Sequence, residues 1–203
     1  MSELKNYIES MSNPELIGLA KNRFLDEEDQ LAIAKHHYKR AHMYLTENQG
    51  LKPKAREALW NSKGYVNKCQ LIAYGHYKNE PEKYEELYRD YGSKIRSRSP
   101  WRMTNIFLRN HRYYTHGGWE QAHPETPASI LEDIYEKDVV RPRQADRCAD
   151  NRWHYGYGHG PEYVERALID SPNTPLDIIV KISASSPKEM NRNLALKQLA
   201  NRS

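Results

Sequence analysis

The sequence predicts an all-α fold of stacked helix pairs, and three observations support this prediction. Apolar residues recur at helical spacing along most of the chain, while the alternation typical of strands is scarce. Two segments, HPETPASILEDIYEKD at 123–138 and SPNTPLDIIVKISASS at 171–186, share one frame. Because a single helix pair cannot bury its apolar face alone, repeated pairs are expected to stack and to share a core.

Each copy of the shared frame contains Thr-Pro followed by apolar residues. We expect each Thr-Pro to start a helix, since a Thr oxygen can cap free backbone N–H groups and Pro suits the first turn. The apolar residues then fall on one face of each helix. They are Ile130, Leu131 and Ile134 in the first copy, and Ile178, Ile179 and Ile182 in the second.

The N-terminal part of the chain is predicted to form short helices separated by polar breaks. A helix is expected over 3–11, and Asn13-Pro14 opens a second one that runs to Ala20. One longer helix is expected over 27–45, ended by Asn48-Gln49-Gly50. Helices over 52–60, 65–77 and 81–91 follow, and the last carries a stripe of tyrosine and leucine.

Further helices are predicted in the C-terminal part. Ser99-Pro100 starts a helix that reaches 107, and others are expected over 143–152, 161–169, 175–184 and 188–200. Gly156 to Gly160 is predicted to be a loop, because three glycines in five residues oppose a helix.

We predict that residues 1–203 form one helical-repeat domain. It would hold weak repeats over 13–76, an irregular basic and aromatic insertion over 77–122, and clearer repeats over 123–203. The two clear copies also finish alike, in ADRCADNR at 145–152 and ALKQLANR at 195–202.

This organisation resembles the variant leucine-rich repeat and the wider HEAT-like class of α-helical repeats. The resemblance implies an irregular α-solenoid with a curved binding surface. The chain departs from the pattern in its irregular spacing and in 77–122, and it lacks the cysteine cluster of some variant-repeat proteins. The residues that carry the resemblance are Ser171, Pro172, Asn173, Thr174, Pro175, Ile178, Ile179, Ile182, Arg192, Leu194, Ala195, Leu199, Ala200, Asn201 and Arg202.

Composition indicates an intracellular protein. The net charge of +4 permits an anionic partner without demanding one. Cys69 and Cys148 form no metal-type pair or disulfide framework, so we expect a reducing, cytoplasmic setting. No signal peptide or bilayer-spanning stretch is visible, and no membrane partner is expected. The histidines lack metal-ligand spacing, so neither a metal nor a cofactor is predicted.

The densest positive stretch lies between residues 93 and 114. Arginine suits phosphate because its planar fork donates two parallel hydrogen bonds, and aromatic rings can stack on bases. This stretch is therefore a candidate nucleic-acid or anion site; alternatively, its arginines pair with the acidic run at 80–90. The candidate residues are Lys94, Arg96, Arg98, Arg102, Arg109, Arg112, Trp101 and Tyr113.

A second candidate site is the glycine-rich segment at 151–163. Glycines let a loop approach a ligand closely, and aromatic rings offer flat faces. It is either a partner-recognition loop or an inter-repeat loop packed by its own aromatics. The candidate residues are Trp153, His154, Tyr155, Tyr157 and His159.

The sequence favours a non-catalytic binding module for a large anionic partner, namely nucleic acid or a nucleoprotein complex. The alternative is a protein–protein adaptor or inhibitor that uses Tyr and Trp anchors. A third hypothesis comes from the resemblance alone, because some HEAT-like proteins are DNA glycosylases that use a Trp, an Asp and an Arg. No matching motif is present, so no catalytic residue is assigned.

Overall fold

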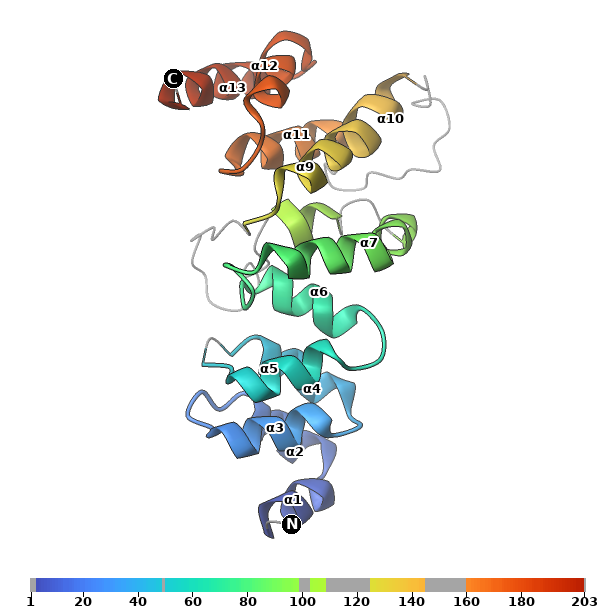
Figure 1. Ribbon diagram of the computed structural model, residues 1–203, viewed down its shortest axis with the longest axis vertical. Coiled ribbons are helices and arrows are strands. Elements are labelled where there is room, and N and C mark those ends of the chain that lie inside the picture. The colour runs from blue at the N-terminus through green and yellow to red at the C-terminus, as the bar shows by residue number, and fades with distance from the viewer. Residues whose placement is uncertain (1–2, 49, 99–102, 109–124, 145–159, 203) are drawn as a thin grey trace. The chain divides into compact units, whose positions relative to one another are not determined.

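The computed structural model describes residues 3–48, 50–98, 103–108, 125–144 and 160–202 (Figure 1). Every regular element in these residues is a helix, which confirms the predicted all-α class. The chain divides into two compact units, Met1–Tyr77 and Lys78–Ser203, which are described separately below. The single repeat domain and the solenoid remain predictions.

In the first unit, each helix from α3 to α6 packs against the helix two places before it in the chain. α3 lies against α1 and α5, α4 lies against α2 and α6, and neighbouring helices such as α3 and α4 also pack together. This alternation buries Leu16, Ile33, Leu45 and Trp60 almost completely. The helices are α1 (Glu3–Ser10), α2 (Asn13–Ala20), α3 (Glu27–Lys35), α4 (Lys39–Thr46), α5 (Pro53–Trp60) and α6 (Val66–Ala73).

The single helix predicted over 27–45 is wrong, because the chain turns a corner between α3 and α4. His36 leaves the helix with ψ 149°, and its Nδ1 accepts a hydrogen bond from the Tyr38 N–H at 3.1 Å. The His42 Nε2 atom lies 2.8 Å from the His36 carbonyl oxygen. Side-chain hydrogen bonds therefore support a bend that the apolar pattern alone does not reveal.

α6 also ends earlier than predicted, at Ala73, in a Schellman motif. Gly75 has φ +75°, its N–H donates to the Ile72 carbonyl at 2.9 Å, and the His76 N–H donates to the Leu71 carbonyl at 3.0 Å. Glycine adopts this left-handed conformation without a Cβ penalty, so the helix stops there.

The second unit is built around α11. This helix contacts η1, α9, η3, α12 and α13, and α12 and α13 lie side by side as a hairpin (Figure 1). α7 continues to Arg98, well past the predicted end at 91. The helices are α7 (Pro81–Arg98), η1 (Thr104–Leu108), α9 (Ala128–Tyr135), η3 (Glu136–Val140), α10 (Arg141–Gln144), α11 (Pro161–Asp170), α12 (Leu176–Ser185) and α13 (Glu189–Arg202).

The two Thr-Pro sequences precede α9 and α12 as predicted, but the threonines do not cap these helices. Pro127 and Pro175 occupy the N-cap positions, with no side-chain cap. Thr126 and Thr174 are buried, and each bonds to a helix earlier in the chain. The Thr174 hydroxyl donates to the Leu168 carbonyl at 2.7 Å, and the Thr126 hydroxyl donates to the Phe107 carbonyl. In both copies the frame therefore satisfies a carbonyl of a helix earlier in the chain.

Candidate functional site

The structure describes part of the predicted anion site. Lys94 is an exposed residue of α7, and Arg96 lies half-buried two residues later. The loop predicted to recognise a partner, with Trp153, His154, Tyr155, Tyr157 and His159, lies outside the described residues, and these roles remain predictions. So do the side chain of Arg98 and the residues Arg102, Arg109, Arg112, Trp101 and Tyr113.

Arg96 is engaged in an internal ion pair. Its Nε donates to Asp138 Oδ1 at 2.9 Å, and one terminal nitrogen donates to the Tyr88 hydroxyl at 2.9 Å and lies 3.6 Å from Asp133 Oδ2. The Arg96 side chain is 19% exposed and that of Asp138 5%. Since Nε and one terminal nitrogen already face protein oxygens, Arg96 holds α7 against α9 and η3 and has fewer donors left for a phosphate.

The acidic partners of Arg96 come from the first repeat copy, whereas the sequence suggested the run at 80–90. Burial raises the pKa of Asp138, and the nearby Arg96 guanidinium only partly opposes this effect. Tyr88 also donates its hydroxyl to Asp133, and burial raises the pKa of that hydroxyl. The cluster around Arg96 therefore has a structural role, since it holds α7 against α9 and η3.

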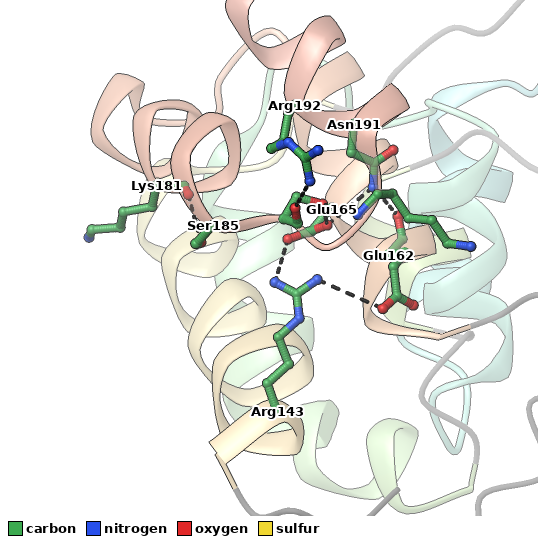
Figure 2. Close-up of polar contacts among 9 residues, drawn as sticks. Arg143, Glu162, Glu165, Lys181, Ser185, Asn191 and Arg192 are labelled. Carbon is green, nitrogen blue, oxygen red and sulfur yellow. Dashed lines mark hydrogen bonds and ion pairs between the residues drawn. The ribbon is translucent and has the colours of Figure 1, made fainter.

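A second polar cluster surrounds Glu165, a fully buried residue of α11 (Figure 2). Arg143, from α10, donates to Glu165 Oε1 at 2.6 Å. The other carboxylate oxygen accepts from the Ser186 hydroxyl at 2.6 Å and from Asn191 Nδ2 at 3.1 Å. One carboxylate thus joins α10, the turn between α12 and α13, and α13 itself.

Side-chain hydrogen bonds also hold the backbone around this cluster. Asn191 Nδ2 donates to the Glu162 carbonyl at 2.9 Å, and Arg192 donates to the Ser186 carbonyl at 2.6 Å (Figure 2). Farther along α13, Arg202 donates to the carbonyls of Ser171 and Thr174, each at 2.7 Å. Arg192 and Arg202 therefore hold turns in place and have a structural role.

Three histidines of the first unit are likewise occupied by hydrogen bonds. His42 faces the His36 carbonyl through Nε2, and its Nδ1 lies 3.2 Å from Asn67 Nδ2. His76 Nε2 lies 2.6 Å from the Thr46 carbonyl oxygen. Burial lowers the pKa of His36, His42 and His76. Within the described ranges, no group of three or more His, Cys, Asp or Glu could hold a metal ion.

Comparisons with known proteins add no assignment. No protein-family model, curated protein or solved structure matches this chain. Among the helices that the structure describes, none combines the length and apolar character needed to cross a membrane.

The binding surfaces that the structure offers were not predicted. An open groove of about 600 Å³ lies between α11 and α13, with Met190 and Leu194 one turn apart and Arg166 and Lys197 beside them. Met190 is 63% exposed. The sequence held one signal for this surface, because α13 carries more apolar residues than its buried face uses. The buried residues of α13 are Asn191 and Ala195, so other apolar side chains of this helix remain accessible.

Proposed function

We propose that this chain is a non-catalytic helical module that binds a protein through the groove between α11 and α13. In this proposal the helix pairs form an irregular α-solenoid that presents the groove. The main support is the exposed Met190 beside half-buried Leu194, because apolar side chains left in water are favourable anchors for a partner.

The charges beside the groove favour a particular partner chemistry. Arg166 and Lys197 flank the two apolar residues, while Glu189 is also part of the lining. Arg166 already pairs with Asp170 at 3.0 Å, so Lys197 contributes the more exposed positive charge. This arrangement suits an amphipathic segment whose apolar side chains enter the groove and whose acidic side chains face Lys197.

Nucleic acid, the partner favoured by the sequence, has less support among the described residues, which include the side chains of only Lys94 and Arg96 among the candidate residues. Arg96 is held by Asp138 and Asp133, and Arg143, Arg192 and Arg202 bind carboxylate or carbonyl oxygens within the protein. The protein alternative is therefore preferred, and nucleic acid becomes an outcome of its test.

The test is affinity purification of the tagged full chain, with and without nuclease. It compares the wild type with two variants, Met190→Glu and Leu196→Glu. Met190→Glu places a charge in the groove and is expected to lose the bound protein. Leu196→Glu is the matched control, since Leu196 lies on the same helix, is 55% exposed and does not line the groove.

A protein that survives nuclease, is retained by Leu196→Glu and is lost with Met190→Glu supports the proposal. Material that disappears on nuclease treatment supports the nucleic-acid alternative instead. A bound protein that is indifferent to Met190→Glu contradicts the groove as its site.

A further inference from the structure

We propose that the corner between α3 and α4 is a proton-sensitive switch, which stays closed only while the His36 imidazole is neutral and opens when His36 is protonated. The proposal does not depend on what the groove in the second unit binds. It rests on one hydrogen bond that a charged imidazole cannot accept, and on the contacts that connect this corner to α6.

The first observation is the hydrogen bond that closes the corner. The chain leaves α3 at His36, whose ψ of 149° is extended, and enters α4 after Tyr38. The Tyr38 backbone N–H donates to His36 Nδ1 at 3.1 Å. Because an imidazole nitrogen accepts a hydrogen bond only when it carries no proton, His36 is neutral in this conformation, with its proton on Nε2.

A proton on His36 Nδ1 would set two N–H donors against each other. The Tyr38 N–H belongs to the backbone, so it cannot be reversed as a side-chain amide can, and a backbone donor without an acceptor is costly. The charged ring must therefore leave Tyr38, and the corner then loses the side-chain bond that holds it. The neutral and the charged imidazole thus favour different conformations of the corner, as a two-state element requires.

The corner is also bonded to α4 and, through α4, to α6. His42 Nε2 lies 2.8 Å from the His36 carbonyl oxygen, and Nε2 is the donor because a carbonyl only accepts. The other ring nitrogen of His42, Nδ1, lies 3.2 Å from Asn67 Nδ2 of α6, which also donates to the Ser62 hydroxyl oxygen at 2.8 Å. Both His42 and Asn67 are buried, so a movement of the His36 backbone reaches α6 through two packed side chains.

The groups around His36 set how readily it takes up a proton. Burial opposes the charged form and lowers the pKa of His36, and His37, whose ring centroid lies 4.2 Å away, acts in the same sense. Glu9 of α1 favours the charged form. His36 lines a cleft of about 470 Å³ along α3, so a protonated ring that leaves Tyr38 has a polar space to enter. The charged residues that line this cleft with His36 are Glu9, Glu27, Glu28, Lys35 and Lys54.

The surroundings of His42 keep that ring neutral. Burial lowers the pKa of His42, the hydrogen bond to the His36 carbonyl opposes this in part, and charge on His36 or Lys39 lowers it further. α6 faces His42 with the neutral amide of Asn67, and on α2, which also packs on α4, Glu15 bonds to its own helix cap. A charge on His36 therefore opposes a second proton on His42, and the first proton is assigned to His36, which lines the cleft.

The test is hydrogen exchange of the Tyr38 amide in the full chain, measured by NMR at pH 7.5 and 5.5 and corrected for the pH dependence of exchange itself. Opening that takes up one proton at an ordinary pKa of about 6.5 lowers the Tyr38 protection factor by up to about tenfold between these pH values. The Asn61 amide at the end of α5, bonded to the Glu57 carbonyl at 3.0 Å, is the internal reference and should change less.

Two variants of His36 separate the proton from the hydrogen bond. His36→Asn keeps an acceptor, because an Asn side-chain oxygen readily accepts the N–H two residues ahead, and it does not titrate. Its Tyr38 protection should be the same at both pH values. His36→Ala removes the acceptor and should lower the Tyr38 protection at pH 7.5 already. His76→Gln is the matched control, since the bond from His76 Nε2 to the Thr46 carbonyl needs only a donor, which both charge states supply.

A second measurement on the wild-type chain keeps the proposal testable if a variant fails to fold. Long-range ¹⁵N spectra report which ring nitrogen carries the proton, and His36 should show the Nε2–H tautomer at pH 7.5. An Nδ1–H tautomer overturns the proposal. So does a Tyr38 protection factor that follows that of Asn61 at both pH values, a pH response that His36→Asn retains, or one that His76→Gln abolishes.

Discussion

At the scale of the residue, buried polar side chains form hydrogen bonds mainly to backbone groups. Thr126 and Thr174 each donate to a carbonyl of the preceding segment, and Gln30 and Asn48 bond two loops. Such groups are costly to bury without partners, so their partners fix where each turn lies. The Thr-Pro frame was visible in the sequence, but the direction of its hydrogen bond was not.

Glu165 provides the sharpest residue-scale prediction. Glu165→Gln replaces a carboxylate that accepts from Arg143, Ser186 and Asn191 by an amide whose N–H₂ group faces donors. We expect the free energy of unfolding to fall by about 3–5 kcal/mol, the usual cost of breaking a buried ion pair. Urea unfolding measures the change.

The control for this prediction is Glu132→Gln, which neutralises an exposed carboxylate of the same unit. It is expected to change stability by about 0.5 kcal/mol at most. An equal loss of unfolding free energy in the two variants would show that Glu165 does not stabilise the packing of α10, α11 and α13.

At the scale of the element, most helices were predictable and their ends were less so. Pro or Asn-Pro marks the starts of α2, α5, α7 and α11, since Pro fits a first turn. The corner at His36 was missed because apolar residues continue on both sides of it at helical spacing. Only the ring contacts of His36 and His42 explain why the chain bends there.

The two glycines Gly18 and Gly75 provide opposite predictions in the first unit. Gly75→Ala forces a Cβ into φ +75° and is expected to cost about 1–2 kcal/mol. Gly18 lies inside α2 with no atom within 4 Å of an added Cβ, so Gly18→Ala should add about 0.5–1 kcal/mol.

Thermal or urea unfolding of the two alanine variants distinguishes these effects, because each serves as the control for the other. A Gly75→Ala variant that kept wild-type stability would contradict the role of the Schellman motif at the end of α6. A Gly18→Ala variant that lost stability would contradict the prediction for α2.

At the scale of the whole molecule, helix packing supplies two compact units whose stability depends on pH. His36, His42 and His76 are packed in the first unit with lowered pKa values, because burial opposes their charged forms. In the unfolded chain they take up protons below the ordinary value of about 6.5, so acidification favours unfolding.

We therefore expect the free energy of unfolding to be fully maintained above pH 6.5 and to fall as the pH drops through the lowered values. Each histidine contributes at most about 1.4 kcal/mol per pH unit. Urea midpoints between pH 7.5 and 5.5 measure this slope. His42→Gln should flatten it, because it removes one of the three imidazoles whose pKa burial lowers.

Two carboxylates, half-buried Asp29 and buried Asp138, act in the opposite sense. Burial raises the pKa of Asp29 and Asp138, so protonation favours the folded state and the contribution is lost as the pH rises through the raised values. The pH range in which these two aspartates change stability begins near their ordinary pKa of 3.8, below the range in which the histidines act. A stability that rose on acidification from pH 7.5 to 6 would contradict the assigned histidine environments.

The sequence by itself determined the all-α class, the approximate order of the helices and the Thr-Pro frame, because helical spacing and helix-start signals are local properties. The tertiary structure alone decided which charges are occupied. Arg96 belongs to a basic stretch in the sequence, yet the fold brings Asp138 to it from 42 residues away. Burial and pairing arise from segments distant in the chain, so the open groove beside Met190 and the contact between His42 and Asn67 also became visible only in three dimensions.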